Sequence, residues 1–390
     1  MEMSAKEKHS FRLKLFRDAQ SWKKPERIPY NASMYTWMFL DSGYTTAQAA
    51  RDYNIIEKCM DRFIQKYEPD QLNAGSSGFR NTFLVMDSLG GVKEYNSETD
   101  SNLNAVIEDV LLPEDYDYVL QNGFNKTLWE KALFKKYPAA KEYTPQQFAK
   151  AAKTMQELNE ARQRIEKNLT EKYGIVFDSV PRFYPGYEYF FKYLRGIKGC
   201  SIDLRRCPQK VFEVSNALDE KNLPSRIKTL SAVDGMDMSQ PFDIMVSMLG
   251  QTILNRKQFD KIWVPPMDKL LGYCAENGKQ VFIFAEGSWE RFGDYFNEFA
   301  KGTVHMIVEQ DDPFEIRKKY PNIGIIGGLS TDVMGHGTPD QCIAMAKKAV
   351  DELGAEGGLT LSPNKMISFA YDMDPANLSA VGKFVQEYRW

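Results

Sequence analysis

Histidine and cysteine, the side chains that most often bind zinc, are scarce in this sequence. Its 390 residues include 3 histidines and 5 cysteines, and no two cysteines form a Cys-x-x-Cys pair. Scattered thiols in odd number predict reduced cysteines in a cytoplasmic protein rather than a disulfide framework. The histidines stand far apart, so they do not indicate a histidine-based metal cluster.

Long apolar runs and blocks of like charge are also missing. No stretch is apolar enough to cross a bilayer, and the polar first 20 residues do not follow the pattern of a signal peptide. The net charge is only −3, and no long run of one sign indicates nucleic-acid binding. We therefore expect a cytoplasmic protein that binds a small molecule, and neither a membrane nor a nucleic acid.

Apolar segments alternate with helical ones through the C-terminal half. Strands are predicted at 242–249, 280–285, 303–308, 323–326 and 358–361, each followed by a helical stretch. Strands that are apolar on both faces are typical of a parallel sheet covered by helices. No flexible linker divides the chain, so we predict a single α/β domain over 1–390, a closed (β/α)8 (TIM) barrel. Because alternation alone does not establish closure, a doubly wound open sheet is the alternative.

The first half is harder to assign. We interpret residues 1–68 as an N-terminal helical extension, with a helix over 45–67, and we expect the barrel to begin at 69–73. Another helix is predicted over 145–173. Between them, 89–143 has mixed polarity and no clear period, so we interpret it as an insertion over the barrel mouth.

Several segments resemble the uroporphyrinogen decarboxylase (URO-D) superfamily. In chain order they are Leu194-Arg-Gly-Ile-Lys-Gly-Cys-Ser-Ile-Asp-Leu-Arg-Arg-Cys-Pro208, Phe284-Ala-Glu-Gly-Ser288, Ile326-Gly-Gly-Leu-Ser330, Gly337-Thr-Pro339, Gly357-Gly-Leu-Thr-Leu-Ser-Pro-Asn364 and Asn377-Leu378. The similarity runs from about Tyr184 to the end and is weak before it. The resemblance implies a (β/α)8 barrel with its site at the C-terminal ends of the strands.

The superfamily contains decarboxylases and methyltransferases, and this sequence departs from the decarboxylases. Those enzymes hold the substrate carboxylates with an arginine-rich N-terminal segment and carry an aspartate after the first strand. Here 28–37 contains no arginine, and 73–78 contains no carboxylate. A substrate with many carboxylates needs several cationic partners. The resemblance therefore favours the methyltransferase-like branch, which is related to corrinoid and coenzyme M methyltransferases.

The zinc ligands of the thiol-methylating relatives are missing as well. Those relatives bind zinc through His-x-Cys at the end of a strand and a later cysteine, whereas this sequence has Phe284-Ala285-Glu286 and Leu361-Ser362 at those places. The demethylating relatives remain, which move a methyl group from a small methylated substrate to a corrinoid on a partner protein. Beyond that possible corrinoid the cofactor is unknown. A decarboxylase (a lyase) and a non-catalytic ligand-binding barrel are the alternatives.

Two glutamates are the candidate catalytic residues. Glu286 and Glu309 each follow an apolar strand, where a carboxylate would face the barrel mouth. Burial there would raise the pKa enough for acid catalysis, or the carboxylate would bind a metal or cap the next helix. Asp311 and Asp312 follow Glu309, and Asp312 before a proline is equally suited to cap a helix.

The candidate substrate-binding residues stand at strand ends or in an aromatic segment: Asn73, Ser247, Gln251, Tyr187 and Gly328. Ser247 and Gln251 offer hydrogen bonds. Tyr187 belongs to the aromatic segment 183–193, which either lines a pocket for an aromatic or corrinoid ring or forms a buried helix face. Gly328 permits the close approach of a ligand or of a helix.

Three arginines complete the candidates. Arg195, Arg205 and Arg206 fall in the first of the segments that resemble the superfamily. They would bind an anion or lie on a solvated helix face.

We expect the purified protein to contain no tightly bound zinc of the His/Cys kind, because the ligand positions of the thiol-methylating relatives hold other residues. Metal analysis of the pure protein checks this. Stoichiometric zinc that disappears when a cysteine is substituted would contradict it.

Overall fold

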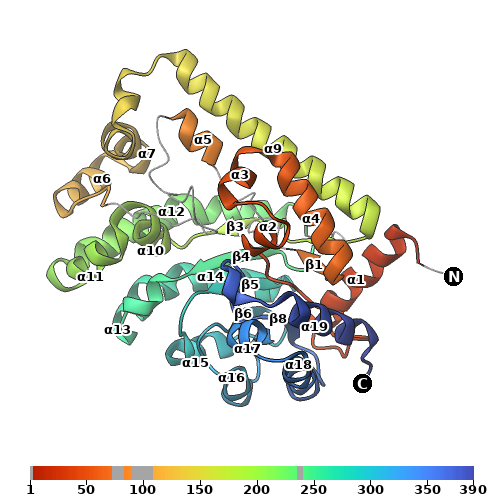
Figure 1. The fold of residues 1–390 in the computed structure, drawn as a ribbon. Helices are drawn as coiled ribbons and strands as arrows, with labels where there is room; N and C mark the ends of the chain where they lie inside the picture. The colour runs from red at the N-terminus through yellow and green to blue at the C-terminus, as the bar shows by residue number, and fades with distance from the viewer. Residues whose placement is uncertain (1–2, 73–82, 90–108, 235–239) are drawn as a thin grey trace.

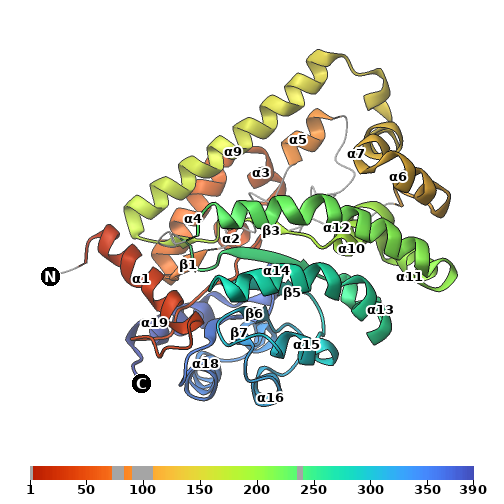
Figure 2. The same cartoon turned by 180° about the vertical axis from the view of Figure 1, so that it is seen from behind.

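The computed structural model describes residues 3–72, 83–89, 109–234 and 240–390. In two opposite views, helices surround a set of short strands (Figures 1 and 2). Candidate residue Asn73 and residues 90–108 of the expected insertion lie outside the described residues. No helix in the described ranges is both long enough and apolar enough to cross a membrane.

Six strands form one sheet in chain order. They are β3 (Arg182–Phe183), β4 (Ile244–Met248), β5 (Val281–Ala285), β6 (Val304–Ile307), β7 (Gly324–Leu329) and β8 (Leu359–Pro363). Every neighbouring pair in this sheet is parallel. Two short strands, β1 (Gln71–Leu72) and β2 (Val176–Phe177), pair in parallel beside it. The strands predicted in the C-terminal half are confirmed as β4 to β8.

A two-residue segment closes this sheet on one side. Tyr30 forms a parallel bridge with Leu361 of β8, and Asn31 forms one with Gln71 of β1. The backbone N–H of Asn31 donates to the carbonyl of Leu361 at 2.9 Å, and the N–H of Gln71 donates to the carbonyl of Tyr30 at 3.2 Å. The last strand of the large sheet is therefore joined to the first strand of the small one.

On the other side, β2 continues into β3 along residues 176–183. This stretch pairs with β1 at its start and with β4 at its end, where the N–H of Met245 donates to the carbonyl of Pro181 at 2.9 Å. Residues 30–31, β1, 176–183 and β4 to β8 thus follow one another around a ring, which is the predicted (β/α)8 barrel. The expectation that the barrel begins at 69–73 is wrong, because residues 30–31 take the first strand position and β1 takes the second. Two residues are too short a segment to show the alternation that identifies a strand in a sequence.

The N-terminal helices are α1 (Ala5–Gln20), α2 (Trp37–Asp41), α3 (Thr46–Arg51), α4 (Tyr53–Tyr67) and α5 (Phe83–Ser88). The single helix predicted over 45–67 is divided into α3 and α4. Asp52 is extended, with φ −139° and ψ 108°, and its side chain accepts a hydrogen bond from the N–H of Asn54. A side-chain cap of this kind starts a new helix.

Residues 109–143 of the expected insertion form short helical turns, namely η1 (Pro113–Asp115), α6 (Tyr116–Asn122), α7 (Phe124–Thr127), η2 (Leu128–Ala132), α8 (Leu133–Lys136) and η3 (Pro138–Glu142). The predicted long helix follows as α9 (Pro145–Tyr173), which begins at a capping box on Thr144 and ends at Gly174 in the left-handed conformation. In both views α9 lies at the opposite end of the molecule from the C-terminal helices.

The remaining helices connect the strands. They are α10 (Gly186–Tyr189), η4 (Phe190–Arg195), α11 (Gly196–Arg206), α12 (Pro208–Ser231), η5 (Gly250–Ile253), α13 (Arg256–Ile262), α14 (Val264–Glu276), η6 (Glu290–Phe292), α15 (Gly293–Asn297), α16 (Pro313–Lys319), α17 (Thr331–His336), α18 (Pro339–Leu353), η7 (Ala370–Asp372) and α19 (Pro375–Glu387). Helix α6 packs against α12, and α18 packs against β7 and β8. The strands from β4 to β8 are almost wholly buried, as expected for a barrel covered by helices.

One buried ion pair anchors the segment that closes the ring. Asp70 is fully buried and accepts hydrogen bonds from both terminal nitrogens of Arg27, at 2.6 and 2.7 Å, and from the N–H of Tyr30 at 3.0 Å. Arg12 of α1 lies 3.3 Å from the same carboxylate. Burial by itself would raise the pKa of Asp70, but the two guanidinium groups and the backbone donor hold it below its ordinary value.

We expect Arg27→Met to lower the free energy of unfolding by about 3 kcal/mol, because it leaves the buried carboxylate of Asp70 with less compensation. Urea unfolding checks this. Lys14→Met is the control, since Lys14 pairs with Asp18 on the surface with 70% of its side chain exposed, and such pairs contribute less than about 1 kcal/mol. Equal losses in the two variants would show that closure does not depend on the buried pair.

Candidate active site at the barrel mouth

The mouth of the barrel is the rim where the parallel strands end. In barrels of this kind, side chains that follow the C-terminal ends of the strands form the functional site. Here the rim carries Gln251 after β4, Glu286 after β5, Glu309 after β6 and Asn364 after β8. The two candidate catalytic glutamates therefore stand on neighbouring strands of one sheet.

A lysine that the sequence reasoning missed joins two of the predicted residues. The Nζ atom of Lys192 donates to Oε1 of Glu286 at 2.9 Å and to Oγ of Ser247 at 2.8 Å. The side chain of Lys192 is only 10% exposed, whereas that of Glu286 is 34% exposed. The ammonium group is thus withdrawn from water, and among the described residues its hydrogen bond uses only the Oε1 oxygen of Glu286.

Lys192 comes from an unusual piece of helix. It lies in η4, a π-helical turn between α10 and α11, and such turns occur frequently at functional sites. It is also the only basic residue in the aromatic segment 183–193. A lone cation in an apolar segment needs a partner once buried, and that signal was available in the sequence.

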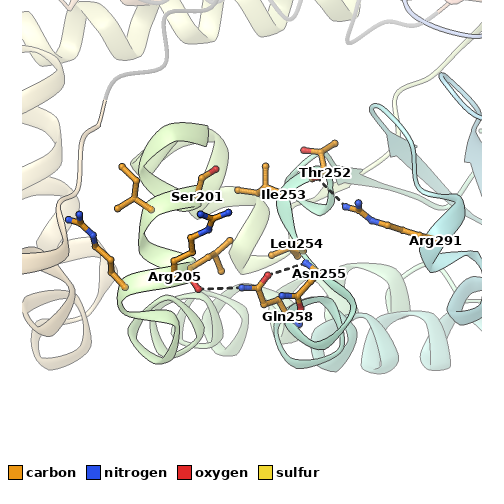
Figure 3. Close-up of a pocket in the computed structure, with 11 residues that line it drawn as sticks. Ser201, Arg205, Thr252, Ile253, Leu254, Asn255, Gln258 and Arg291 are labelled. Carbon is orange, nitrogen blue, oxygen red and sulfur yellow. Dashed lines mark hydrogen bonds between the residues drawn. The ribbon is translucent and has the colours of Figure 1, made fainter.

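Gln251 supports the backbone of the Glu286 turn. It is fully buried, and its Nε2 donates to the carbonyl of Glu286 at 2.7 Å. Its own segment is held by Arg291, which donates to the carbonyl of Gln251 at 2.5 Å and to that of Thr252 at 3.1 Å. Figure 3 shows the contact with Thr252. The contacts of Gln251 therefore position Glu286, while its Oε1 atom has no partner among the described residues.

Glu309 lies next to the Glu286 turn. Its side chain accepts a hydrogen bond from the N–H of Gly287. Burial raises the pKa of Glu309, and the neighbouring carboxylate of Glu286 raises it further. The hydrogen bond from the N–H of Gly287 and the positive charge of Lys365 lower it. The net shift is upward, which brings Glu309 closer to the range in which a carboxylic acid donates a proton near neutral pH.

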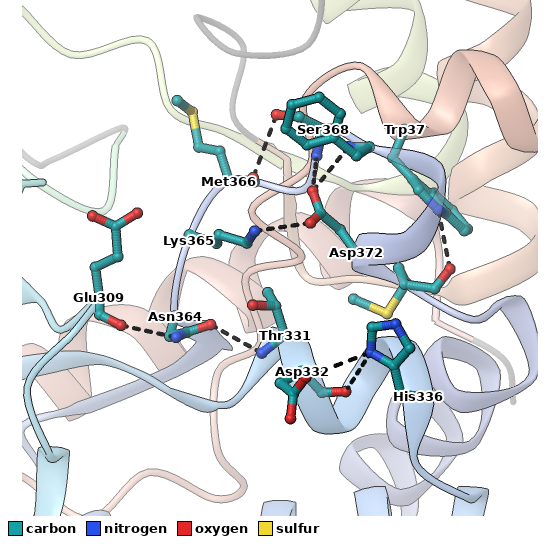
Figure 4. A network of polar contacts seen from close by, with 12 residues as sticks. Trp37, Glu309, Thr331, Asp332, His336, Asn364, Lys365, Met366, Ser368 and Asp372 are labelled. Atoms are coloured by element: carbon teal, nitrogen blue, oxygen red, sulfur yellow. Dashed lines mark hydrogen bonds and ion pairs between the residues drawn. The ribbon is translucent and has the colours of Figure 1, made fainter. Parts of the chain in front are cut away.

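The loop after β8 holds the far side of the mouth. Asn364 donates through Nδ2 to the carbonyl of Glu309 at 2.9 Å and accepts from the N–H of Thr331 at 3.0 Å (Figure 4). The next residue, Lys365, donates to the buried carboxylate of Asp372 at 2.8 Å. This network orders the loop, and it places the positive charge of Lys365 where it acts on Glu309. None of these loop residues was among the candidates.

Two other candidates are packed inside the fold. Tyr187 is fully buried behind Gly250, where an added Cβ would come within 2.5 Å of the tyrosine ring. Gly328 has a φ of +95°, and an added Cβ would come 2.9 Å from the Cβ of Ala349 on α18. The glycine therefore permits the close approach of a helix.

The two aspartates after β6 cap backbone N–H groups. Asp312 accepts from the N–H of Phe314 at the start of α16, and Asp311 accepts from Ser288 Oγ and the N–H of Trp289 at 2.6 and 2.8 Å. In the parts of the chain that the structure describes, no group of three or more His, Cys, Asp or Glu side chains is arranged to hold a metal ion.

Comparison with known proteins agrees with this architecture. Residues 203–388 match the family model of uroporphyrinogen decarboxylase (URO-D), which confirms the resemblance over that range. The matched range includes Glu286 and Glu309 but begins after Lys192. Among solved structures, a methyltransferase from Methanosarcina mazei is similar, with a TM-score of 0.60, 12% sequence identity and 99% of each chain covered. At this identity the likeness shows the fold alone. No curated protein matches the sequence.

We expect Glu309→Gln to raise the melting temperature slightly at pH 8 and by less at pH 4.5. The pKa of Glu309 is higher in the folded protein than in the unfolded chain, so ionisation costs stability as the pH rises above about 4.3. Thermal unfolding at the two pH values checks this. Glu315→Gln, an exposed change on the helix that follows, serves as the control and should show no such difference. A lower melting temperature for Glu309→Gln at pH 8 would mean that the ionised carboxylate stabilises the Gly287 turn.

Proposed function

We propose that this protein is a methyltransferase component that moves a methyl group from a small methylated substrate to a corrinoid carried by a partner protein. The match to the URO-D family over residues 203–388 and the barrel shared with a methyltransferase support this class of enzyme. The single observation that carries the proposal is the group formed by Lys192, Glu286 and Glu309 at the barrel mouth.

Transfer of a methyl group to a corrinoid breaks the bond between the methyl carbon and a substrate oxygen or nitrogen. The corrinoid, when bound by the partner, supplies the nucleophile that forms the new bond to carbon. The electron pair of the broken bond stays on the oxygen or nitrogen, which then takes up a proton. The protein therefore has to position the substrate and to supply that proton.

The residues at the mouth suit both tasks. Glu309 is our candidate proton donor, because burial and the neighbouring carboxylate raise its pKa. Lys192 and Glu286 form a partly buried ion pair that offers a donor and an acceptor to a polar substrate. Ser247 holds the lysine in place. Gly287, the residue after Glu286, donates its backbone N–H to the carboxylate of Glu309, and this hydrogen bond fixes the position of Glu309 relative to the Glu286 turn.

Decarboxylation is the second candidate function. Arg205, Arg206 and Arg291 line a cavity beside the mouth, and arginine is well suited to hold a carboxylate. Release of coproporphyrinogen from uroporphyrinogen in an anaerobic assay would favour this candidate over methyl transfer.

We expect Glu309→Gln to lower the rate of methyl transfer to the corrinoid partner by about 10²- to 10⁴-fold, the usual loss when a general acid is removed. The assay follows loss of the methyl group from a candidate methylated substrate. Glu315→Gln, the exposed change on the next helix, should keep the full rate. A folded Glu309→Gln variant with full activity would exclude Glu309 as the proton donor.

Glu286→Gln gives a separate test of how the two carboxylates interact. Removing the negative charge of Glu286 should lower the pKa of Glu309, so the alkaline limb of the kcat/KM profile should move to lower pH. A loss of rate with an unchanged pH profile would mean that Glu286 acts on the substrate alone.

A further inference from the structure

A cavity of about 850 Å³ lies between α11 and the segment that follows β4 (Figure 3). Three arginines line it, namely Arg205, Arg206 and Arg291. The other lining residues are uncharged, so no acidic side chain is among the described residues that line the cavity. Its volume lies within the range of about 300–1,000 Å³ that is common for small-molecule sites.

The three guanidinium groups have no carboxylate partner in the described part of the chain. Arg205 and Arg206 stand at the end of α11, where a positive charge also interacts favourably with the helix dipole. That explanation does not extend to Arg291, which comes from η6 on the other side of the cavity. Arginines from two separate elements therefore line one cavity.

Arg291 is held in place before any ligand arrives. Its Nη2 donates to the carbonyls of Gln251 and Thr252, and its guanidinium lies 4.8 Å from the ring centre of Phe292. No described acceptor takes a hydrogen bond from its Nε or Nη1 atoms. A fixed guanidinium loses less conformational entropy when it binds an anion.

Like charges that line one cavity without counter-ions repel one another, and a bound anion reduces that repulsion. The cavity also offers Ile202 and Ile253 as apolar surface. An organic molecule with an anionic group at one end fits both properties. Protein surfaces bind phosphates and carboxylates through the same paired guanidinium donors.

We propose that this cavity binds an organic anion, whose phosphate or carboxylate group contacts Arg205, Arg206 and Arg291 and whose apolar part lies against Ile202 and Ile253. The proposal does not depend on methyl transfer. The cavity adjoins the mouth, because Thr252 lines it and lies next to Gly287. A ligand there would therefore lie beside the Glu286 turn.

Isothermal titration calorimetry at low ionic strength tests the proposal, with sodium pyrophosphate and sodium citrate titrated separately into the full-length protein. We expect at least one of them to bind at a single saturable site and to bind more weakly as sodium chloride is added. Binding of pyrophosphate alone identifies a phosphate site, and binding of citrate alone identifies a carboxylate site. Binding of both identifies a general anion site.

Arg291→Gln and Arg205→Gln locate the site. Each should weaken binding by about tenfold, the effect of losing one charged hydrogen bond. Arg205 lies on an exposed helix end, so its variant tests the proposal even if Arg291→Gln unsettles its own loop. Arg164→Gln is the matched control, since Arg164 is 51% exposed on α9 and does not line the cavity.

Weaker binding in Arg205→Gln or Arg291→Gln with unchanged binding in Arg164→Gln supports the proposal. Three outcomes would overturn it: no saturable binding of either anion, equal affinity in all variants, or an equal loss in Arg164→Gln. The last would show a response to overall charge rather than to a site.

Discussion

The carboxylate of Asp70 holds together the two parts of the chain that close the barrel. This carboxylate accepts hydrogen bonds from Arg27 and from the N–H of Tyr30, and the backbone N–H of Asp70 donates to the Tyr30 carbonyl. Without the segment at Tyr30, β8 and β1 would each present an open edge of unpaired backbone groups. Such a short segment makes few ladder hydrogen bonds, and the bond from the N–H of Tyr30 to the buried Asp70 carboxylate adds a further contact that positions it.

The barrel mouth depends on this closure, because the functional side chains stand on loops between separate strands. Ser247, Glu286 and Glu309 come from β4 and from the turns after β5 and β6. Their spacing is set by the parallel register of the strands below them. Hydrogen bonds across the rim, from Gln251 to Glu286 and from Asn364 to Glu309, then hold the turns themselves.

Charges of both signs lie at the mouth, and two of the carboxylates, Glu286 and Glu309, are neighbours. Lys192 pairs with Glu286, and the turn after Glu286 donates a hydrogen bond to Glu309. Lys365 pairs with the buried Asp372, and its positive charge also acts on Glu309. Burial and the neighbouring carboxylate of Glu286 disfavour the ionised form of Glu309 and raise its pKa. Proteins retain such unfavourable electrostatics mainly at functional sites, because a better-compensated arrangement would be more stable.

The class of fold and part of the site could be predicted from the amino-acid sequence. Buried parallel strands need apolar residues on both faces, so β4 to β8 could be recognised, and Glu286 and Glu309 stood out because they follow such strands. The sequence could not show that the barrel closes through Tyr30 and Asn31, because two residues are too few to form a recognisable strand pattern. The packing of Gly328 against α18 and of Tyr187 behind Gly250 was equally hidden.

Only the tertiary structure brought Lys192 to Glu286, which lies 94 positions away in the chain. It likewise joined Arg205 to Arg291 around one cavity. Local sequence patterns report which residues are buried and which elements they form. The pairing of charges across elements depends on how the strands and helices are placed in space, and a single sequence does not record that.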